Sequence, residues 1–65
     1  MSKPRKSYTV NVQGNRVPEA VRNGYHAYYS EYTNITAVEV KAKSKREAKM
    51  LAFRATGSEV LYVFE

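Results

Sequence analysis

The sequence predicts a small α+β domain, with a mostly antiparallel sheet of three to four strands and one long amphipathic helix packed on one face. Alternating apolar and polar residues predict the strands, helical periodicity in one segment predicts the helix, and Gly, Asn and Pro residues lie between them. The predicted order is strand, short helix or loop, strand, strand, long helix, strand. Residues 7–65 form this domain, and residues 1–6 form a flexible basic arm because MSKPRK offers little to bury.

The first predicted strand covers residues 7–13. Tyr8, Val10 and Val12 alternate with polar residues, so we expect them on the buried face of a sheet with one polar face. The Gly14 and Asn15 pair that follows favours a turn, because both residues tolerate positive φ.

Residues 17–24, VPEAVRNG, fit two interpretations. Pro18 suits the first position of a short helix and Gly24 suits the position after its end. The same segment also fits a loop with a turn at Asn23 and Gly24. If the segment is helical, its expected buried side consists of Val17, Ala20 and Val21.

Residues 25–32, YHAYYSEY, contain four of the six tyrosines, and aromatic content of this kind is typical of a strand. Alternation predicts one face with Tyr25, Ala27 and Tyr29, and the other with His26, Tyr28, Ser30 and Tyr32. Thr33 and Asn34 form a tight connection to the next strand, so residues 25–42 are predicted to be a hairpin.

Residues 36–57, TAVEVKAKSKREAKMLAFRATG, change from strand to helix periodicity. Val38, Val40 and Ala42 alternate with charged residues and predict a half-buried strand. Ser44 and Glu47 then form a capping box, in which the Ser44 hydroxyl accepts from the Glu47 amide and the carboxylate reaches back to the Ser44 amide. The expected buried stripe of the helix is Ala48, Leu51, Ala52 and Ala55, and Gly57 is its predicted left-handed cap.

Residues 59–64 predict a closing strand. The segment is apolar on both expected faces, with Leu61 and Val63 on one and Val60, Tyr62 and Phe64 on the other. A strand that is buried on both sides usually lies inside a sheet, so we expect an interior position. A right-handed crossover through the helix can place it parallel to the strand before the helix.

The predicted helix carries a second face, opposite its alanine stripe, where large apolar residues lie among cations. This face consists of Arg46, Met50 and Phe53, flanked by Lys49 and Arg54. One interpretation is that the segment before residue 25 folds over the apolar pair, since single exposed apolar residues need no function. The other is a partner-binding patch, because Met, Phe and Arg are enriched at protein interfaces.

The composition favours an intracellular protein with an acidic partner. Eleven lysines and arginines against six glutamates give a net charge of +5, which attracts nucleic acid, a membrane surface or an acidic protein. The chain has no cysteine and no apolar run of membrane-spanning length, and the basic start is not followed by an apolar signal segment. We therefore expect a soluble cytoplasmic protein without a membrane partner.

The cations are concentrated around the junction of the third strand and the long helix. Cations in the first helical turn oppose the helix dipole, so Lys45 and Arg46 cost some stability, which suggests another use. A solvated face that maintains solubility explains the same cluster. If the junction binds nucleic acid, the expected contacts are Lys41, Lys43, Lys45, Arg46 and Lys49 to phosphates, with Tyr28 and Tyr32 stacking on bases.

The residue inventory gives little basis for catalysis. His26 is the one histidine, and the chain has no cysteine and no aspartate. An activated nucleophile needs a base and an orienting third group, and a metal site needs more than one imidazole. The three glycines are far apart and fit turns or a cap, so no phosphate-cradling loop is expected. We predict a protein that is not an enzyme and binds no cofactor or metal.

Residues 44–55, SKREAKMLAFRA, resemble the start of the final helix of double-stranded RNA-binding domains. In that family a serine and a basic pair face phosphates, so the resemblance implies phosphate contacts by Lys45, Arg46 and Lys49. The chain departs from the family in two ways: the leading helix is absent or very short, and a strand follows the helix.

From Tyr25 onwards, the aromatic strand, the VEVKA strand, the S-x-x-E-A helix start, the A-T-G cap and the EVLYV strand resemble in layout the small inhibitors encoded by bacteriophages, such as the T7-type inhibitor of bacterial RNA polymerase. The resemblance implies a protein of the host cytoplasm that occupies a surface of a polymerase or a defence complex and inhibits or redirects it. We favour this protein-binding function, since apolar anchors beside arginines fit a protein interface better than a phosphate track. Direct binding of duplex RNA or DNA is the alternative, and a homodimer that buries the open tyrosine face is a third.

Overall fold

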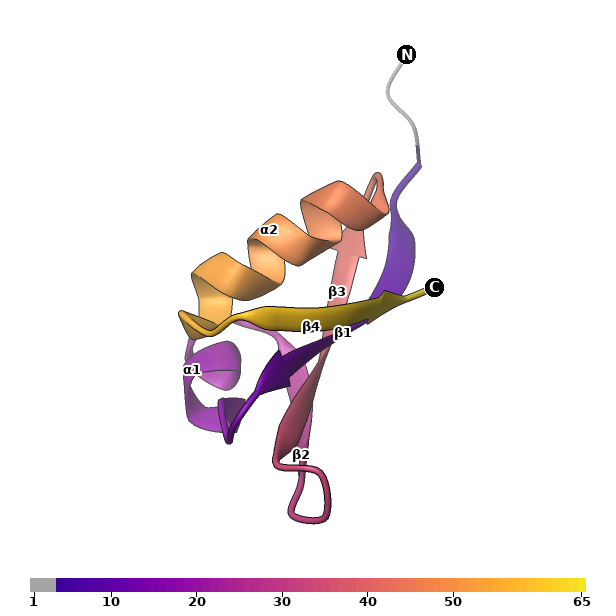
Figure 1. Ribbon diagram of the computed structural model, residues 1–65. Coiled ribbons are helices and arrows are strands. Elements are labelled where there is room, and N and C mark those ends of the chain that lie inside the picture. Colours follow the sequence, from indigo (N-terminus) through magenta and orange to yellow (C-terminus); the bar gives the residue numbers. More distant parts are fainter. Residues whose placement is uncertain (1–3) are drawn as a thin grey trace.

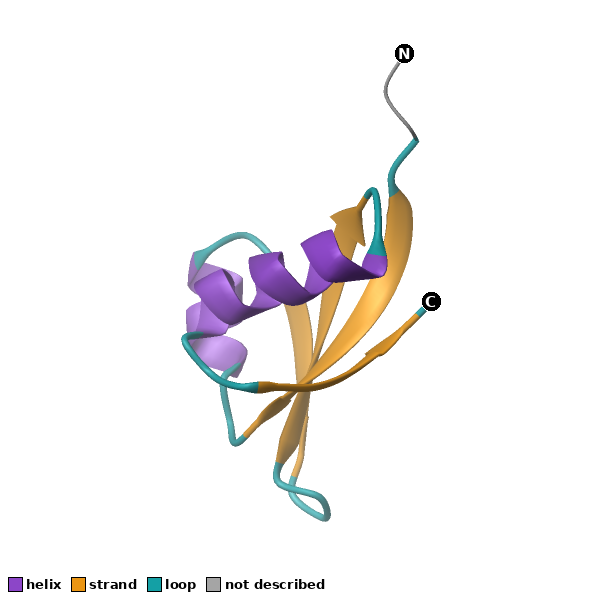
Figure 2. Ribbon diagram, turned by 45° about the horizontal axis from the view of Figure 1, so that its top comes forward, coloured by secondary structure: helices purple, strands orange, loops and turns teal. Residues whose placement is uncertain are grey.

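The computed structural model describes residues 4–65. The elements in order are β1 (Lys6–Gln13), α1 (Val17–Arg22), β2 (His26–Ser30), β3 (Ile35–Ala42), α2 (Lys45–Thr56) and β4 (Val60–Phe64) (Figure 1). Both helices lie on one side of a four-stranded sheet, as Figures 1 and 2 show. The α+β prediction is confirmed. This connectivity of two interleaved split β-α-β units is the ferredoxin-like arrangement.

The sheet is antiparallel throughout, with the strand order β2-β3-β1-β4. The β2–β3 hairpin is present as predicted. Strand β4 runs parallel to β3 with β1 between them, since both pair antiparallel with β1. The interior position predicted for β4 is wrong, because β4 forms an edge of the sheet. The two central positions are taken by β1 and β3, which share the longest register.

The core lies between the two helices and the face of β1 and β3 toward them. In register, Tyr8 lies opposite Val40 and Val10 opposite Val38. These pairs share one face of the sheet because directly opposed residues point the same way. The buried apolar residues of the core cluster are Tyr8, Val10, Val12, Ala20, Val38, Val40, Ala42, Ala48 and Ala52. The sequence predicted that all of these residues are buried. For Ala20 the prediction depended on residues 17–24 forming a helix.

Helix α2 begins and ends as its caps predict, with one difference. The Ser44 hydroxyl accepts from the Glu47 amide at 3.2 Å, and Gly57 takes φ +67 while its N–H donates to the Phe53 carbonyl at 2.7 Å. The Glu47 carboxylate accepts from the Lys43 amide at 3.0 Å, not from the Ser44 amide as the capping box requires. The carboxylate therefore fixes the loop before the helix as well as its first turn.

We expect Ser44→Ala to lower the free energy of unfolding by about 1 kcal/mol, because the Glu47 amide loses its acceptor at the start of α2. Urea unfolding followed by circular dichroism measures the change. Ser30→Ala is the matched control, since Ser30 is exposed at the end of β2 and caps no helix. Equal stability of the two variants would show that the cap contributes nothing.

The structure decides between the two interpretations of residues 17–24 in favour of a helix. Pro18 lies in the first turn of α1, and the Asn23 side chain donates to the carbonyls of Glu19 at 2.9 Å and Ala55 at 3.0 Å. The second bond joins the end of α1 to the end of α2. Ala20 is fully buried as expected, but Val21 is 58% exposed, so its predicted burial is wrong. The helix is too short to bury a wider face.

Thr36, on β3, forms two hydrogen bonds with the segment between β1 and α1, which we call the first turn. Its hydroxyl accepts from the Arg16 amide at 2.8 Å and donates to the Gly14 carbonyl at 2.6 Å, and the residue is fully buried. These two bonds satisfy the backbone of the segment between β1 and α1, which has no strand partner there. The sequence alone did not single out this residue.

Strand β4 exposes side chains that were expected inside. Its register with β1 shifts between Asn11 and Val12, which places Val60 opposite Val12 and Val63 opposite Val10, both half-buried against the core. The remaining side chains are exposed, namely Leu61 at 44%, Tyr62 at 57% and Phe64 at 47%. The predicted alternation for this strand is wrong, because a bulge breaks the period of two.

Two boundaries differ from the prediction. Strand β1 begins at Lys6, so this residue belongs to the sheet, whereas Lys3 of the predicted arm lies outside the described residues. Strand β2 ends at Ser30, and Tyr32 lies in the turn that follows. Within residues 4–65, neither helix has the length and apolar character needed to cross a bilayer.

Candidate functional site

A groove runs between the outer face of α2 and strand β4. Its volume is about 500 Å³, and its lining residues are Arg46, Lys49, Met50, Phe53, Glu59 and Val60. We call it the α2–β4 groove. Met50, Phe53 and Val60 supply apolar surface, and Arg46, Lys49 and Glu59 supply charge. Met, Phe and Arg are enriched at protein interfaces, whereas Lys and Glu are depleted at their centres, so Met50, Phe53 and Arg46 are the candidates for central contacts.

The apolar pair of α2 is open to solvent. Met50 is 45% exposed and Phe53 is 53% exposed, so no segment among residues 4–65 folds over them. This excludes the interpretation in which the chain before residue 25 covers the pair. The exposure follows from the helix period, since Ala48, Ala52 and Ala55 occupy the buried stripe on the opposite side.

The cations of α2 form no ion pair with a carboxylate of residues 4–65, although Glu59 lines the same groove. Among residues 4–65 there are two ion pairs within 4.0 Å, Lys6 with Glu65 and Arg16 with Glu19. The side chains of Arg46, Lys49 and Arg54 belong to neither pair. An acidic partner can therefore bind them without first breaking an internal ion pair.

Comparison with family models, with curated proteins and with solved structures gives no match. The resemblances to phage-encoded inhibitors and to double-stranded RNA-binding domains therefore stay predictions. The physical evidence on function comes from the side chains and surfaces of this chain.

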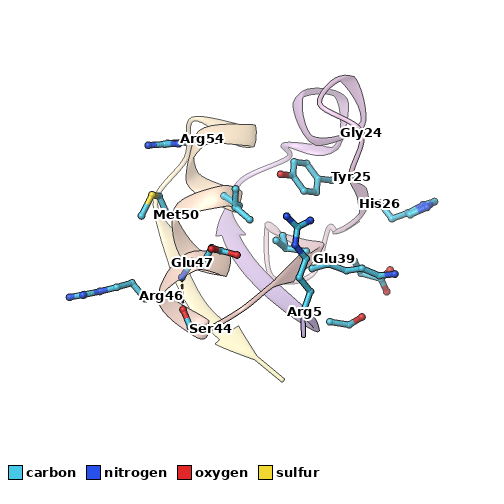
Figure 3. Close-up of a pocket in the computed structure, with 14 residues that line it drawn as sticks. Arg5, Gly24, Tyr25, His26, Glu39, Ser44, Arg46, Glu47, Met50 and Arg54 are labelled. Atoms are coloured by element: carbon cyan, nitrogen blue, oxygen red, sulfur yellow. Dashed lines mark hydrogen bonds between the residues drawn. The ribbon is translucent and has the colours of Figure 1, made fainter. Parts of the chain in front are cut away.

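A second, wider hollow of about 700 Å³ lies on the other side of α2, toward the start of β2 (Figure 3). In this view Arg5, Tyr25 and Glu47 point into the space, whereas Arg46 and Met50 point away from it. The hollow exists because β2 pairs with β3 only as far as Glu39, so the last residues of β3 have no neighbouring strand on that side. Its charges are mixed, and the Glu47 carboxylate already accepts from the backbone.

The residues predicted to contact nucleic acid do not form one surface. Lys45, Arg46 and Lys49 lie on α2, and Lys41 lies on β3 opposite Ser7. Tyr32 is fully exposed in the turn at the far end of β3, so the length of that strand separates it from the junction (Figure 1). Tyr28 and Lys41 lie on the face of the sheet away from the helices, whereas Lys45, Arg46 and Lys49 lie on α2. The predicted set is therefore divided between two sides of the molecule.

Two groups of surface residues were missed from the sequence. Glu59 and Val60 complete the α2–β4 groove, and Tyr62 and Phe64 are exposed on the other face of the sheet, away from the helices. Both groups lie in the segment that was expected inside the sheet. The charged residues Glu59 and Glu65 that flank this strand were a signal of an edge.

His26 is exposed on β2 and lies opposite Glu39 in register. Within residues 4–65, no three histidine, aspartate or glutamate side chains lie together in a way that could hold a metal ion. The groups that converge are apolar side chains and cations, which bind partners through burial and charge.

Proposed function

We propose that this chain is a small non-catalytic binding protein that docks through the α2–β4 groove on an acidic protein surface. The observation that carries the proposal is the exposure of Met50 and Phe53 between cations that lack internal carboxylate partners. Apolar anchors beside arginine are the side chains that contribute most to the centre of protein interfaces.

The proposed partner belongs to a complex that handles nucleic acid, such as a polymerase or a defence complex, in the cytoplasm of a bacterial host. A chain with net charge +5 is attracted to the acidic surfaces of such a complex. The layout resemblance to phage-encoded inhibitors agrees with this class of partner. Occupation of that surface would inhibit or redirect the complex.

The alternative is direct binding of duplex RNA or DNA by the basic junction. It is supported by the cations of α2 and by the local resemblance of residues 44–55 to double-stranded RNA-binding domains. It is weakened by Met50 and Phe53, because phosphate contacts need hydrogen-bond donors and charge, not apolar anchors. Nuclease treatment separates the two proposals.

We expect the double variant Phe53→Ala, Arg46→Glu to lose a partner that the unchanged chain captures from nuclease-treated bacterial lysate. The first change removes an apolar anchor and the second reverses a charge in the same groove, so the retained amount should fall at least tenfold. Affinity capture followed by mass spectrometry measures it.

The matched control is Tyr32→Ala, Arg22→Glu, which makes the same types of change at exposed positions away from α2 and β4. This variant should capture the partner as well as the unchanged chain does. Capture that survives the groove substitutions, or that disappears from every sample after nuclease treatment, would contradict docking through this groove.

A further inference from the structure

The face of the sheet opposite the two helices is uncovered and carries aromatic rings. Tyr28 on β2 is 70% exposed, and Tyr62 and Phe64 on β4 are exposed by about half. The rings of Tyr62 and Phe64 lie with centroids 4.6 Å apart and planes inclined by 60°. Since β2 and β4 are the two edges of the sheet, the aromatic residues border this open face on both sides.

The register arranges the open face in rows across the strands. Tyr28 lies opposite Ala37, Ala37 opposite Asn11, and Asn11 opposite Tyr62. Directly opposed residues share a face, so this row runs from one edge to the other. The backbones of Tyr28 and Tyr62 are therefore about 14 Å apart, because three spacings between neighbouring strands separate them. The next row ends at Phe64.

The floor between the aromatic borders is polar along β1, whereas along β3 it carries Ile35, Ala37, Glu39 and Lys41. Every outward-facing side chain of the central strand β1 is a hydroxyl or an amide, namely Ser7, Thr9, Asn11 and Gln13. A second copy that packed its own open face on this one would remove these groups from water, at a cost for each donor or acceptor left unpaired. The edges of nucleic-acid bases carry matching donors and acceptors.

One end of the open face is basic. Lys41 lies opposite Ser7 on this face, and Arg5 lines the same hollow as Lys41. Neither cation has a carboxylate within 4.0 Å among residues 4–65. Glu39 is the acidic residue of the face, and it lies opposite His26 and Thr9.

We propose that the open face of the sheet binds single-stranded nucleic acid, independently of the α2–β4 groove. Bases stack on Tyr62 and Phe64 at one edge and on Tyr28 at the other, since aromatic side chains stack on bases of any sequence. Asn11 between them donates to and accepts from base edges. Lys41 and Arg5 contact the phosphates at the basic end.

The test is a titration of the purified chain with fluorescein-labelled (dT)₁₂ and (rU)₁₂, followed by fluorescence anisotropy. We expect micromolar binding at low salt, with log K falling against log salt with a slope of about −1.4 if Lys41 and Arg5 neutralise two phosphates. DNA and RNA share the bases and phosphates used here, so the two probes report whether the sugar matters. Binding of either supports the site.

Tyr62→Ala should raise the dissociation constant about tenfold, because one stacking platform is lost. Tyr28→Ala on the opposite edge should weaken binding to a similar extent. Lys41→Glu should weaken binding and make the salt slope shallower, since a phosphate contact is lost. Val21→Ala is the control, since Val21 is an exposed apolar residue on α1, on the helix side of the sheet, and the change should leave binding unchanged.

Absence of binding to both probes at low salt would overturn the proposal, as would equal affinities of Tyr62→Ala and the control. A dimer seen by sedimentation that Tyr62→Ala dissociates would assign the face to a second copy instead. A duplex of the same length is a third probe. If it binds more strongly than the single strands, and if Lys49→Glu abolishes this binding while Tyr62→Ala does not, the nucleic-acid site is the junction of β3 and α2 and not the open face. All of these measurements use the purified chain, so their outcome does not depend on the protein partner proposed for the α2–β4 groove.

Discussion

Ala52→Glu is expected to leave the chain unfolded at 25 °C. Ala52 is fully buried between α2 and the sheet, where a glutamate side chain has neither space nor a cation to pair with. An uncompensated buried charge costs about 3–5 kcal/mol, and overpacking adds to it. That total is comparable with the whole stability of a domain of this size, roughly 3–10 kcal/mol. Circular dichroism and the dispersion of amide NMR signals measure the loss of structure.

Phe53→Glu is the matched control, because it places the same side chain at the next position. Phe53 is 53% exposed on the outer side of α2, so its replacement should leave the fold intact and shift the unfolding midpoint only slightly. The pair of variants therefore tests the rotation of the helix on the sheet. If Ala52→Glu folds and Phe53→Glu does not, the assignment of inner and outer faces is reversed and the α2–β4 groove does not exist.

Thr36→Val is expected to lower the free energy of unfolding by about 2 kcal/mol. Valine has the shape of threonine, so packing is preserved, but the Arg16 amide loses its acceptor and the Gly14 carbonyl loses its donor. Leaving a buried donor or acceptor unpaired costs about 1–3 kcal/mol for each group. Both hydrogen bonds are part-buried, so the lower end of this range applies to each. A change of this size lowers the melting temperature of a small domain by roughly 10 °C.

Thr33→Val is its control, since Thr33 is exposed in the turn between β2 and β3. Thermal unfolding by calorimetry should show a midpoint close to that of the unchanged chain for this variant. A Thr36→Val protein as stable as the Thr33→Val protein would mean that water satisfies the backbone groups of the first turn, and the role given to the Thr36 hydroxyl would be wrong.

The sequence predicted those parts of the fold that are determined by residues close to one another in the chain. The stripe of Ala48, Ala52 and Ala55 and the caps at Ser44 and Gly57 define α2 within fourteen residues. The alternation in β1 and β3 defines which side chains enter the core. Local periodicity is informative here because one face of each element is buried and the other is solvated.

The candidate site was predicted in part for the same reason. The helical wheel placed Met50 and Phe53 away from the alanine stripe, and the structure shows them exposed. Glu59 and Val60 of the groove could not be found in this way, because α2 and β4 meet through the tertiary fold. Their segment looked apolar on both faces, and a bulge in the pairing with β1 redistributed its side chains.

The sequence by itself determined the kind and approximate extent of every strand and of the long helix, the buried face of each central element, and the outward position of the apolar pair on α2. Tertiary structure alone decided that β4 lies at an edge, that the hydroxyl of Thr36 holds the first turn, and that Tyr28 and Tyr62 share one open face. The physical reason is distance along the chain: hydrophobic periods report on residues within one element, whereas register and strand order depend on contacts between residues far apart in the sequence.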